Sequence, residues 1–105
     1  MREDSVFSAL SDGSRRRLLE SLAGRDSASL TELAAGLPVT RQAVSKHLAA
    51  LSDAGLVQAR RAGRETRYRL TPEPLADALS WMERVGSEWD ERLARLREHL
   101  TSTSR

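Results

Sequence analysis

The chain has 105 residues and a net charge of +2, with 39% hydrophobic and only 4% aromatic residues, which predicts one small domain. It contains no cysteine, so disulfides, thiolate metal sites and cysteine nucleophiles are excluded. No stretch approaches the ~20 apolar residues of a membrane span, and the N-terminus lacks the apolar core of a signal peptide, so we expect a cytoplasmic protein.

The first 40 residues predict three short helices that are separated by turn signals. These signals are Ser11-Asp12-Gly13, Gly24 and Gly36. Leucines gather on one face of the second helix, 14–23, which gives that helix an apolar side. Ser29 is followed by Glu32 at the spacing of a capping box, so we expect the third helix to begin at Ser29.

A fourth helix is predicted from Thr40 to Ala54, with Thr40 as its N-cap and Gly55 as its stop. At 100° per residue, its inward side carries Val44, His47, Leu48 and Leu51. Its outward side carries only small, polar or charged residues, namely Gln42, Ser45, Lys46, Ala49 and Asp53. His47 lies at the edge of the inward side, where a structural histidine and a phosphate contact are both open.

A β-hairpin follows, because two extended segments over 56–61 and 65–70 flank a three-residue turn. Arg61 and Arg64 lie at its tip. The two faces of the second strand differ, since an apolar face with Thr66, Tyr68 and Leu70 lies opposite a basic face with Arg67 and Arg69. Residues 41–70 hold seven basic side chains against two acidic ones, so this third of the chain predicts a polyanionic partner.

The last helix is predicted to begin in Thr71-Pro72-Glu73-Pro74 and to run to about Leu100, with a disordered tail over 101–105. Its apolar residues recur in steps of four and three, which is a heptad seam: Leu75, Leu79, Met82, Gly86, Trp89, Leu93, Leu96 and Leu100. We expect the first part of this seam to pack on the core of its own subunit and the rest to face a second copy. Gly86 fits either a close helix approach or a kink.

Two short helices joined by a proline-containing turn, followed by a basic hairpin, form the arrangement of a winged helix-turn-helix domain. We therefore expect a mainly α fold of about five helices with a two-stranded wing, in one domain over residues 1–100. The major groove of B-DNA admits an α-helix, and Gln, Ser, Arg and Lys side chains can read base edges there. Double-stranded DNA is the predicted partner.

The residues that carry this pattern resemble the ArsR (ArsR/SmtB) family of bacterial transcriptional regulators. The segment TRQAVSKHL at 40–48 is similar to the recognition helix of the family, and LSDGSRR at 10–16 and GRE at 63–65 are similar to its flanking motifs. The resemblance covers residues 5–100. It implies a homodimeric repressor whose first and last helices form the dimer interface, with DNA contacts at Arg41, Gln42, Ser45 and Lys46.

The chain departs from the metal-sensing members of that family. Those proteins use a cysteine pair in the third helix, or histidines and carboxylates in the last helix. This chain has no cysteine, and its last helix has a single histidine, His99, so we predict no metal site and no cofactor. The sequence also lacks a catalytic Ser, His and Asp motif and a phosphate-binding loop, so the chain is predicted not to be an enzyme.

The predicted sites follow from these assignments. DNA is expected to contact Thr40, Arg41, Gln42, Ser45, Lys46 and His47 of the fourth helix and Arg61, Arg64, Arg67 and Arg69 of the wing. The dimer is expected to bury Val6, Phe7, Leu10, Trp89, Leu93 and Leu96, and its two-fold symmetry predicts a pseudo-palindromic operator. The alternative is a winged-helix protein–protein adaptor, in which the same basic surface would bind an acidic protein.

Overall fold

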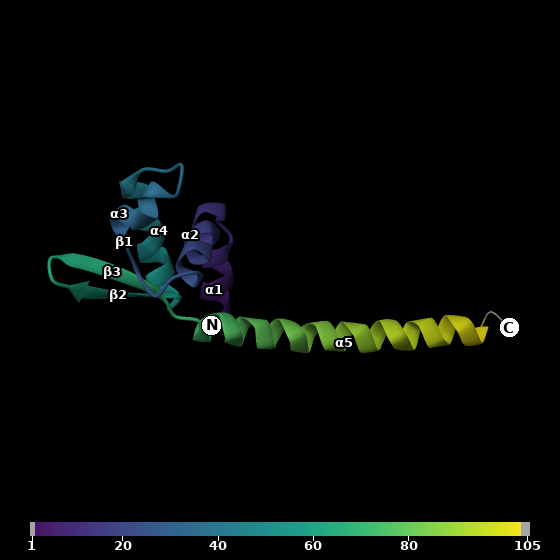
Figure 1. Ribbon diagram of the computed structural model, residues 1–105. Coiled ribbons are helices and arrows are strands. Elements are labelled where there is room, and N and C mark those ends of the chain that lie inside the picture. Colours follow the sequence, from purple (N-terminus) through teal and green to yellow (C-terminus); the bar gives the residue numbers. More distant parts are fainter. Residues whose placement is uncertain (1, 104–105) are drawn as a thin grey trace.

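Over residues 2–103, which the structure describes, the chain forms five helices and three short strands (Figure 1). This computed structural model also places the side chains of residues 4–99. The elements in chain order are α1 (Arg2–Leu10), α2 (Gly13–Ala23), β1 (Ala28–Ser29), α3 (Leu30–Ala35), α4 (Arg41–Asp53), β2 (Val57–Ala62), β3 (Glu65–Leu70) and α5 (Glu73–Thr103). The expected mainly α fold with five helices is confirmed.

Side-chain caps begin α3 and α4 at the residues that the sequence predicts. The hydroxyl of Ser29 accepts the backbone N–H of Glu32 at 3.1 Å. The hydroxyl of Thr40 accepts the backbone N–H of Ala43 at the same distance. Each bond satisfies an amide of the first helical turn that has no partner within the helix, so both helix starts are locally encoded.

A tight turn after α4 sets the direction of the wing. Gly55 has a φ of +76°, and its N–H donates to the carbonyl of Ser52 at 2.9 Å. The N–H of Leu56 donates to the carbonyl of Leu51 at 2.9 Å, which completes a Schellman motif. Glycine suits the left-handed position of this motif because it has no Cβ. The chain therefore leaves α4 sharply, and β2 begins with the buried Val57.

The sheet has three strands and not the two that the sequence predicts. β3 lies between β1 and β2, and both pairings are antiparallel. Tyr68 of β3 lies opposite Ala28 on one side and Ala59 on the other. β1 has only two residues, which is too short to produce a periodic pattern, so it depends on its pairing with β3. Gly63, with a φ of +66°, begins the two-residue turn between β2 and β3.

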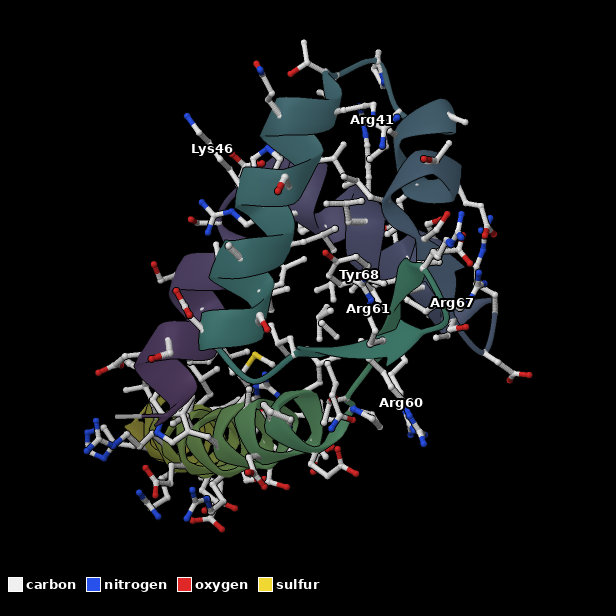
Figure 2. The ribbon with its side chains drawn as sticks, turned by 90° about the vertical axis from the view of Figure 1, so that its left-hand side faces the viewer. Arg41, Lys46, Arg60, Arg61, Arg67 and Tyr68 are labelled. Atoms are coloured by element: carbon white, nitrogen blue, oxygen red, sulfur yellow. The ribbon has the colours of Figure 1, made fainter. Side chains whose placement is uncertain are left out.

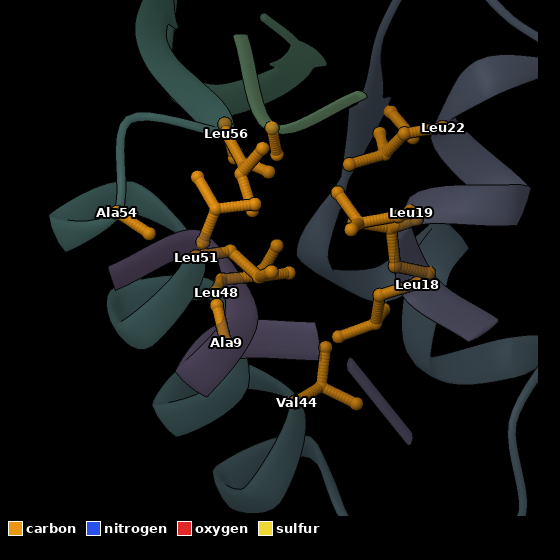
Figure 3. Packing of buried hydrophobic residues seen from close by; sticks show 14 residues of the cluster. Ala9, Leu18, Leu19, Leu22, Val44, Leu48, Leu51, Ala54 and Leu56 are labelled. Atoms are coloured by element: carbon orange, nitrogen blue, oxygen red, sulfur yellow. The ribbon is translucent and has the colours of Figure 1, made fainter. Parts of the chain in front are cut away.

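The core lies among α1, α2, α4 and the inner face of the sheet (Figure 3). Leu18 and Leu22 of α2 meet Val44, Leu48 and Leu51 of α4 there, and each of these five side chains is at most 1% exposed. Since every apolar side chain on the inward face of α4 is covered, this packing fixes how the helix is rotated about its axis. The rotation in turn decides which side chains face solvent.

α5 extends well beyond the core and gives the molecule extents of 73 × 25 × 23 Å (Figure 1). Ala78 is buried, and Trp81 packs edge to face on Phe7 of α1 with a centroid separation of 5.6 Å. Leu79 and Met82, by contrast, are 53% and 47% exposed. The expectation that the first part of the seam packs on its own core is therefore wrong beyond Leu75, because the helix docks through a row displaced by one residue.

The length and straightness of α5 settle two further points. The helix is continuous through Gly86, which excludes a kink at that glycine. The tail that the sequence predicts to be disordered over 101–105 is helical as far as Thr103, and residues 104 and 105 lie outside the described part. Over the described residues, no helix combines the length and the apolar character that crossing a bilayer requires.

Replacing Leu51 by alanine tests the packing that holds α4. We expect Leu51→Ala to reduce the free energy of unfolding by about 2–5 kcal/mol, because the removed methyl groups leave a cavity in a closed core. Urea denaturation followed by circular dichroism measures the change. Gln58→Ala, on the exposed face of β2, is the control and should change it by less than about 0.5 kcal/mol. A loss below about 1 kcal/mol for Leu51→Ala would contradict this packing.

Candidate nucleic-acid interface

The outward face of α4 carries the side chains that the sequence predicts for it. Arg41, Gln42, Ser45 and Lys46 are all exposed, whereas Val44 between them is fully buried. In Figure 2, Lys46 points away from the core. Each of the four exposed residues has hydrogen-bonding groups, and all four lie within the first two turns of the helix, where winged-helix proteins contact base edges.

Thr40 and His47 lie at the borders of this face. Thr40 is exposed and caps the helix, so its hydroxyl proton remains available to an acceptor. His47 is half-buried and lies near Asp12, the N-cap of α2. The N–H groups of Arg15 and Ser14 donate to the Asp12 carboxylate and lower its pKa. His47 therefore lies where the end of its face of α4 approaches the start of α2.

The cations of the wing divide between its two faces. Arg61 lies opposite Thr66, so it shares the face of Tyr68 that packs on the core, but its side chain is exposed because it lies near the tip of the hairpin. Arg60 lies opposite Arg67, so both belong to the outer face. Arg61 also donates through Nε to the carbonyl of Gly63 at 3.2 Å, which folds its side chain over the turn. The exposed Arg64 follows in the turn itself.

Arg67 has a different environment from the other predicted DNA contacts. Its guanidinium donates to both oxygens of Ser27, the hydroxyl at 2.8 Å and the carbonyl at 3.1 Å. It also pairs with Glu32 at 3.0 Å and with Glu65 at 3.2 Å. The side chain is 30% exposed. Arg67 thus connects β3 to α3 and to the segment before β1, and most of its donors have partners inside the subunit.

The Arg67 network also alters the acidity of Glu32. The hydrogen bond from Arg67 holds the pKa of this carboxyl below its ordinary value, and Ser29 adds to the shift. Arg25 approaches the other carboxylate oxygen at 3.4 Å. Sequence reasoning missed this network, because the spacing from Ser29 to Glu32 predicts only a helix cap. A partner 35 residues away has no local signal.

Arg69 is exposed near the end of β3, at the base of the wing, five residues after Arg64 of the turn. There it borders a hollow of about 420 Å³ together with Leu22 and Arg25 of the α2 end. The structure therefore brings the predicted contacts of α4 together on one face and places Arg61 and Arg64 at the wing tip. Arg69 lies toward the base of the wing, where it borders a second hollow of about 490 Å³ together with Arg60, Arg61 and Arg67.

Comparisons with known proteins agree with this geometry. A helix-turn-helix domain model matches residues 10–58. The transcriptional repressor SdpR of Bacillus subtilis (strain 168) is 32% identical over 79 residues, which cover 75% of this chain and 87% of SdpR. The structure of an ArsR-like transcriptional regulator from Rhodococcus sp. RHA1 is 46% identical, covers 92% of this chain and 91% of that one, and superposes with a TM-score of 0.82.

The chain belongs to the ArsR family. It is accordingly a transcriptional regulator with a winged helix-turn-helix DNA-binding domain, and not an enzyme. A second similar solved structure, the winged helix-turn-helix domain of Mb0332 from Mycobacterium bovis, is described as homodimeric and as a possible ArsR-family regulator. It is 30% identical, covers 87% of this chain and 83% of that one, and has a TM-score of 0.66.

The residues predicted for a dimer interface of this ArsR-family regulator fall into three groups. Val6 is 0% exposed and packs inside its own subunit, so its inclusion in the interface is wrong. Phe7 and Leu10 are half-buried at the margin of the core, and Phe7 also contacts Trp81 of α5. The α5 side chains are about half exposed, at 57%, 50% and 53% for Trp89, Leu93 and Leu96.

The pH dependence of stability tests the Arg67 network. Because folding lowers the pKa of Glu32, its contribution is present at neutral pH and is lost as the pH falls through the lowered value. We expect Glu32→Gln to lower the melting temperature by a few degrees at pH 7, with the difference from wild type vanishing in acid. Thermal melts across this pH range measure it, and Glu20→Gln on the exposed side of α2 is the control. A difference that persists unchanged in acid would contradict the assigned role.

Proposed function

We propose that the protein is a homodimeric repressor that binds a pseudo-palindromic operator through α4 and the wing. The observation that carries this proposal is the outward face of α4, which is polar and basic and lacks any large apolar side chain. A helix with this face fits the major groove, because base edges and phosphates offer hydrogen-bonding groups there and few apolar contacts.

Within this proposal, the residues near the start of α4 read bases. Gln42 can bond bidentately to adenine, and Ser45 can reach several base edges. Arg41 and Lys46 can reach guanine edges or neutralise phosphates beside the groove. Thr40 and His47, at the borders of the face, are assigned to phosphates, which orient the helix without selecting sequence.

The wing contributes contacts of a different kind. Arg61 and Arg64 at the tip are assigned to phosphates or to the adjacent minor groove. Arg67 is assigned a supporting role, since its bonds to Ser27 and Glu32 hold β3 against the rest of the domain. Arg69 is exposed at the wing base and is assigned to a phosphate outside the main contact region.

Repression follows most simply from occupancy of an operator that overlaps a promoter. SdpR, similar over three quarters of this chain, is named a transcriptional repressor, and the Mb0332 domain is described as homodimeric. A two-fold dimer would present two copies of α4 to successive major grooves about 34 Å apart. An adaptor that binds an acidic protein would need large apolar residues at the centre of its contact surface, and the exposed face of α4 has none.

A mobility-shift assay tests the proposed function. The probe is a DNA fragment from upstream of the protein's own gene, titrated over a salt series, with a fragment of unrelated sequence as competitor. We expect one discrete complex that resists the competitor and contains two protein chains per operator. Equal affinity for both fragments at every salt concentration would overturn sequence-specific binding.

Gln42→Ala separates base reading from positioning. We expect it to weaken operator binding by about 1–3 kcal/mol while leaving binding to unrelated DNA almost unchanged, because the amide contacts a base edge and not a phosphate. Fluorescence anisotropy with both DNA fragments measures the two affinities. An equal loss on both fragments would show that Gln42 only positions the helix.

Neutralising the arginines of the wing tip should weaken binding to every DNA sequence, in contrast to Gln42→Ala, which should weaken binding to the operator alone. We expect Arg61→Gln and Arg64→Gln each to weaken binding to all DNA sequences and to flatten the log–log salt slope by about 0.9 per lost phosphate contact. The slope is measured by anisotropy from low to moderate salt. Arg60→Gln is the matched control, since Arg60 neighbours Arg61 but lies on the outer face, and it should leave the slope unchanged. An unchanged slope in both tip variants would show that the wing tip does not contact DNA phosphates.

A further inference from the structure

The outer side of the wing borders the hollow of about 490 Å³, which the proposed DNA contacts of α4 do not use. This wing hollow is lined by Asp26 and Ser27 of the segment before β1 and by Arg60, Arg61, Arg67 and Arg69 of the wing. Four arginines against one carboxylate give the lining an excess of positive charge. The volume of the hollow lies within the range of small-molecule sites, so a small anion is the ligand that charge and size favour.

Three of these arginines lie on one face of the hairpin. Arg60 of β2 lies directly opposite Arg67 of β3, and Arg69 follows two residues further along β3 on the same face. Like charges in such cross-strand positions destabilise a sheet. Glu32 and Glu65 offset the charge of Arg67. Within the part of the chain that the structure describes, however, Arg60 and Arg69 form no ion pair, so the fold leaves two neighbouring cations without a counter-charge.

Asp26 lines the same hollow without neutralising these two cations. Over the described residues, no ion pair joins it to Arg60 or to Arg69, so a space separates the opposite charges. Asp26 and Arg69 also both border the hollow beside Leu22, which adjoins the wing hollow. A ligand that offers anionic oxygens to the arginines and a hydroxyl or amino group to Asp26 would satisfy both kinds of side chain at once.

We propose that the wing hollow binds a phosphorylated small molecule, with Arg60 and Arg69 on its phosphate groups and Asp26 on a hydroxyl or amino group. Guanidinium groups suit this ligand because their planar fork bonds two phosphate oxygens at a time. A DNA backbone fits the hollow less well, since the Asp26 carboxylate repels a continuous row of phosphates. In Figure 2, moreover, Arg60 and Lys46 of α4 point to different sides of the domain.

A ligand in the wing hollow would make operator binding depend on the ligand, a consequence that rests on the proposed function. Arg69 is assigned there to a DNA phosphate, and Arg61 of the tip directly follows Arg60 in β2. A bound phosphate group occupies Arg69 and adds negative charge beside the tip, so it weakens the attraction between wing and DNA. The ligand would therefore act as an inducer that releases the repressor.

Calorimetric titration of the 105-residue chain without DNA tests the site. The probes are inorganic pyrophosphate and adenosine diphosphate (ADP), both at one fixed ionic strength. We expect both to bind, and we expect Arg60→Gln and Arg69→Gln each to weaken binding about tenfold or more, because each variant removes charge-assisted hydrogen bonds. Arg64→Gln is the matched control, since it removes the same charge from an exposed position outside the hollow, and it should change binding less than about threefold.

The role of Asp26 gives the two probes opposite responses. We expect Asp26→Ala to tighten pyrophosphate binding, because the carboxylate repels the phosphate groups. The same variant should weaken ADP binding relative to pyrophosphate binding, because ADP loses the acceptor for its hydroxyl or amino groups. An equal change for both probes would overturn the contact between Asp26 and the ligand.

Three results would overturn the site itself. One is the absence of binding by either probe at millimolar concentration. Another is a loss in Arg64→Gln equal to those in Arg60→Gln and Arg69→Gln, which would show that the probes respond only to the total charge of the wing. The third is a flatter salt slope of operator binding in both hollow variants with unchanged probe binding, which would make the hollow part of the DNA interface.

Fluorescence anisotropy with operator DNA tests the regulatory step separately. We expect saturating ADP to weaken operator binding by the wild-type protein about fivefold or more and to leave Arg60→Gln unaffected. Unchanged operator affinity at saturation would overturn the inducer role and leave the anion site standing. A protein that binds no operator would overturn the proposed function, whereas the calorimetric result, obtained without DNA, would still decide the site.

Discussion

The burial of one face of α4 is the constraint on which the rest of the structure depends. Val44, Leu48 and Leu51 are covered by α2 and by the inner face of the sheet, so the helix can take only one rotation about its axis. That rotation exposes Gln42, Ser45 and Lys46 as a group. The Schellman turn at the end of α4 then directs β2 away from the helix, so the same packing also determines where the wing projects.

The arginines of the wing show that a local excess of charge does not assign a function to each cation. Arg61 and Arg64 lie at the tip, whereas Arg67 donates to Ser27 and pairs with Glu32 inside the subunit. A guanidinium has five donors in a planar fork, which allows one side chain to bond a hydroxyl, a carbonyl and two carboxylates at once. The wing therefore uses one of its cations to hold its own position.

α5 illustrates how one helix serves two apolar contacts. The row that contains Ala78 and Trp81 packs on the core, and the adjacent row that contains Leu79 and Met82 is exposed. The rows are displaced by one residue, which is about 100° around a helix. The heptad pattern of the sequence does not distinguish the two rows. Only the docking of α1 against α5 shows which side of the helix faces the core and which side remains uncovered.

The sequence by itself determined the helices, the caps at Ser29 and Thr40, the hairpin and the outward residues of α4. These features depend on periodicity and on hydrogen bonds between residues only a few positions apart. Only the tertiary structure decided the third strand, the burial of Val6 and the docking row of α5. It also decided the partners of Arg67, which lie 35 and 40 residues away in the chain. Such contacts form between segments that folding brings together, and a local sequence pattern does not specify which distant residues its side chains will contact.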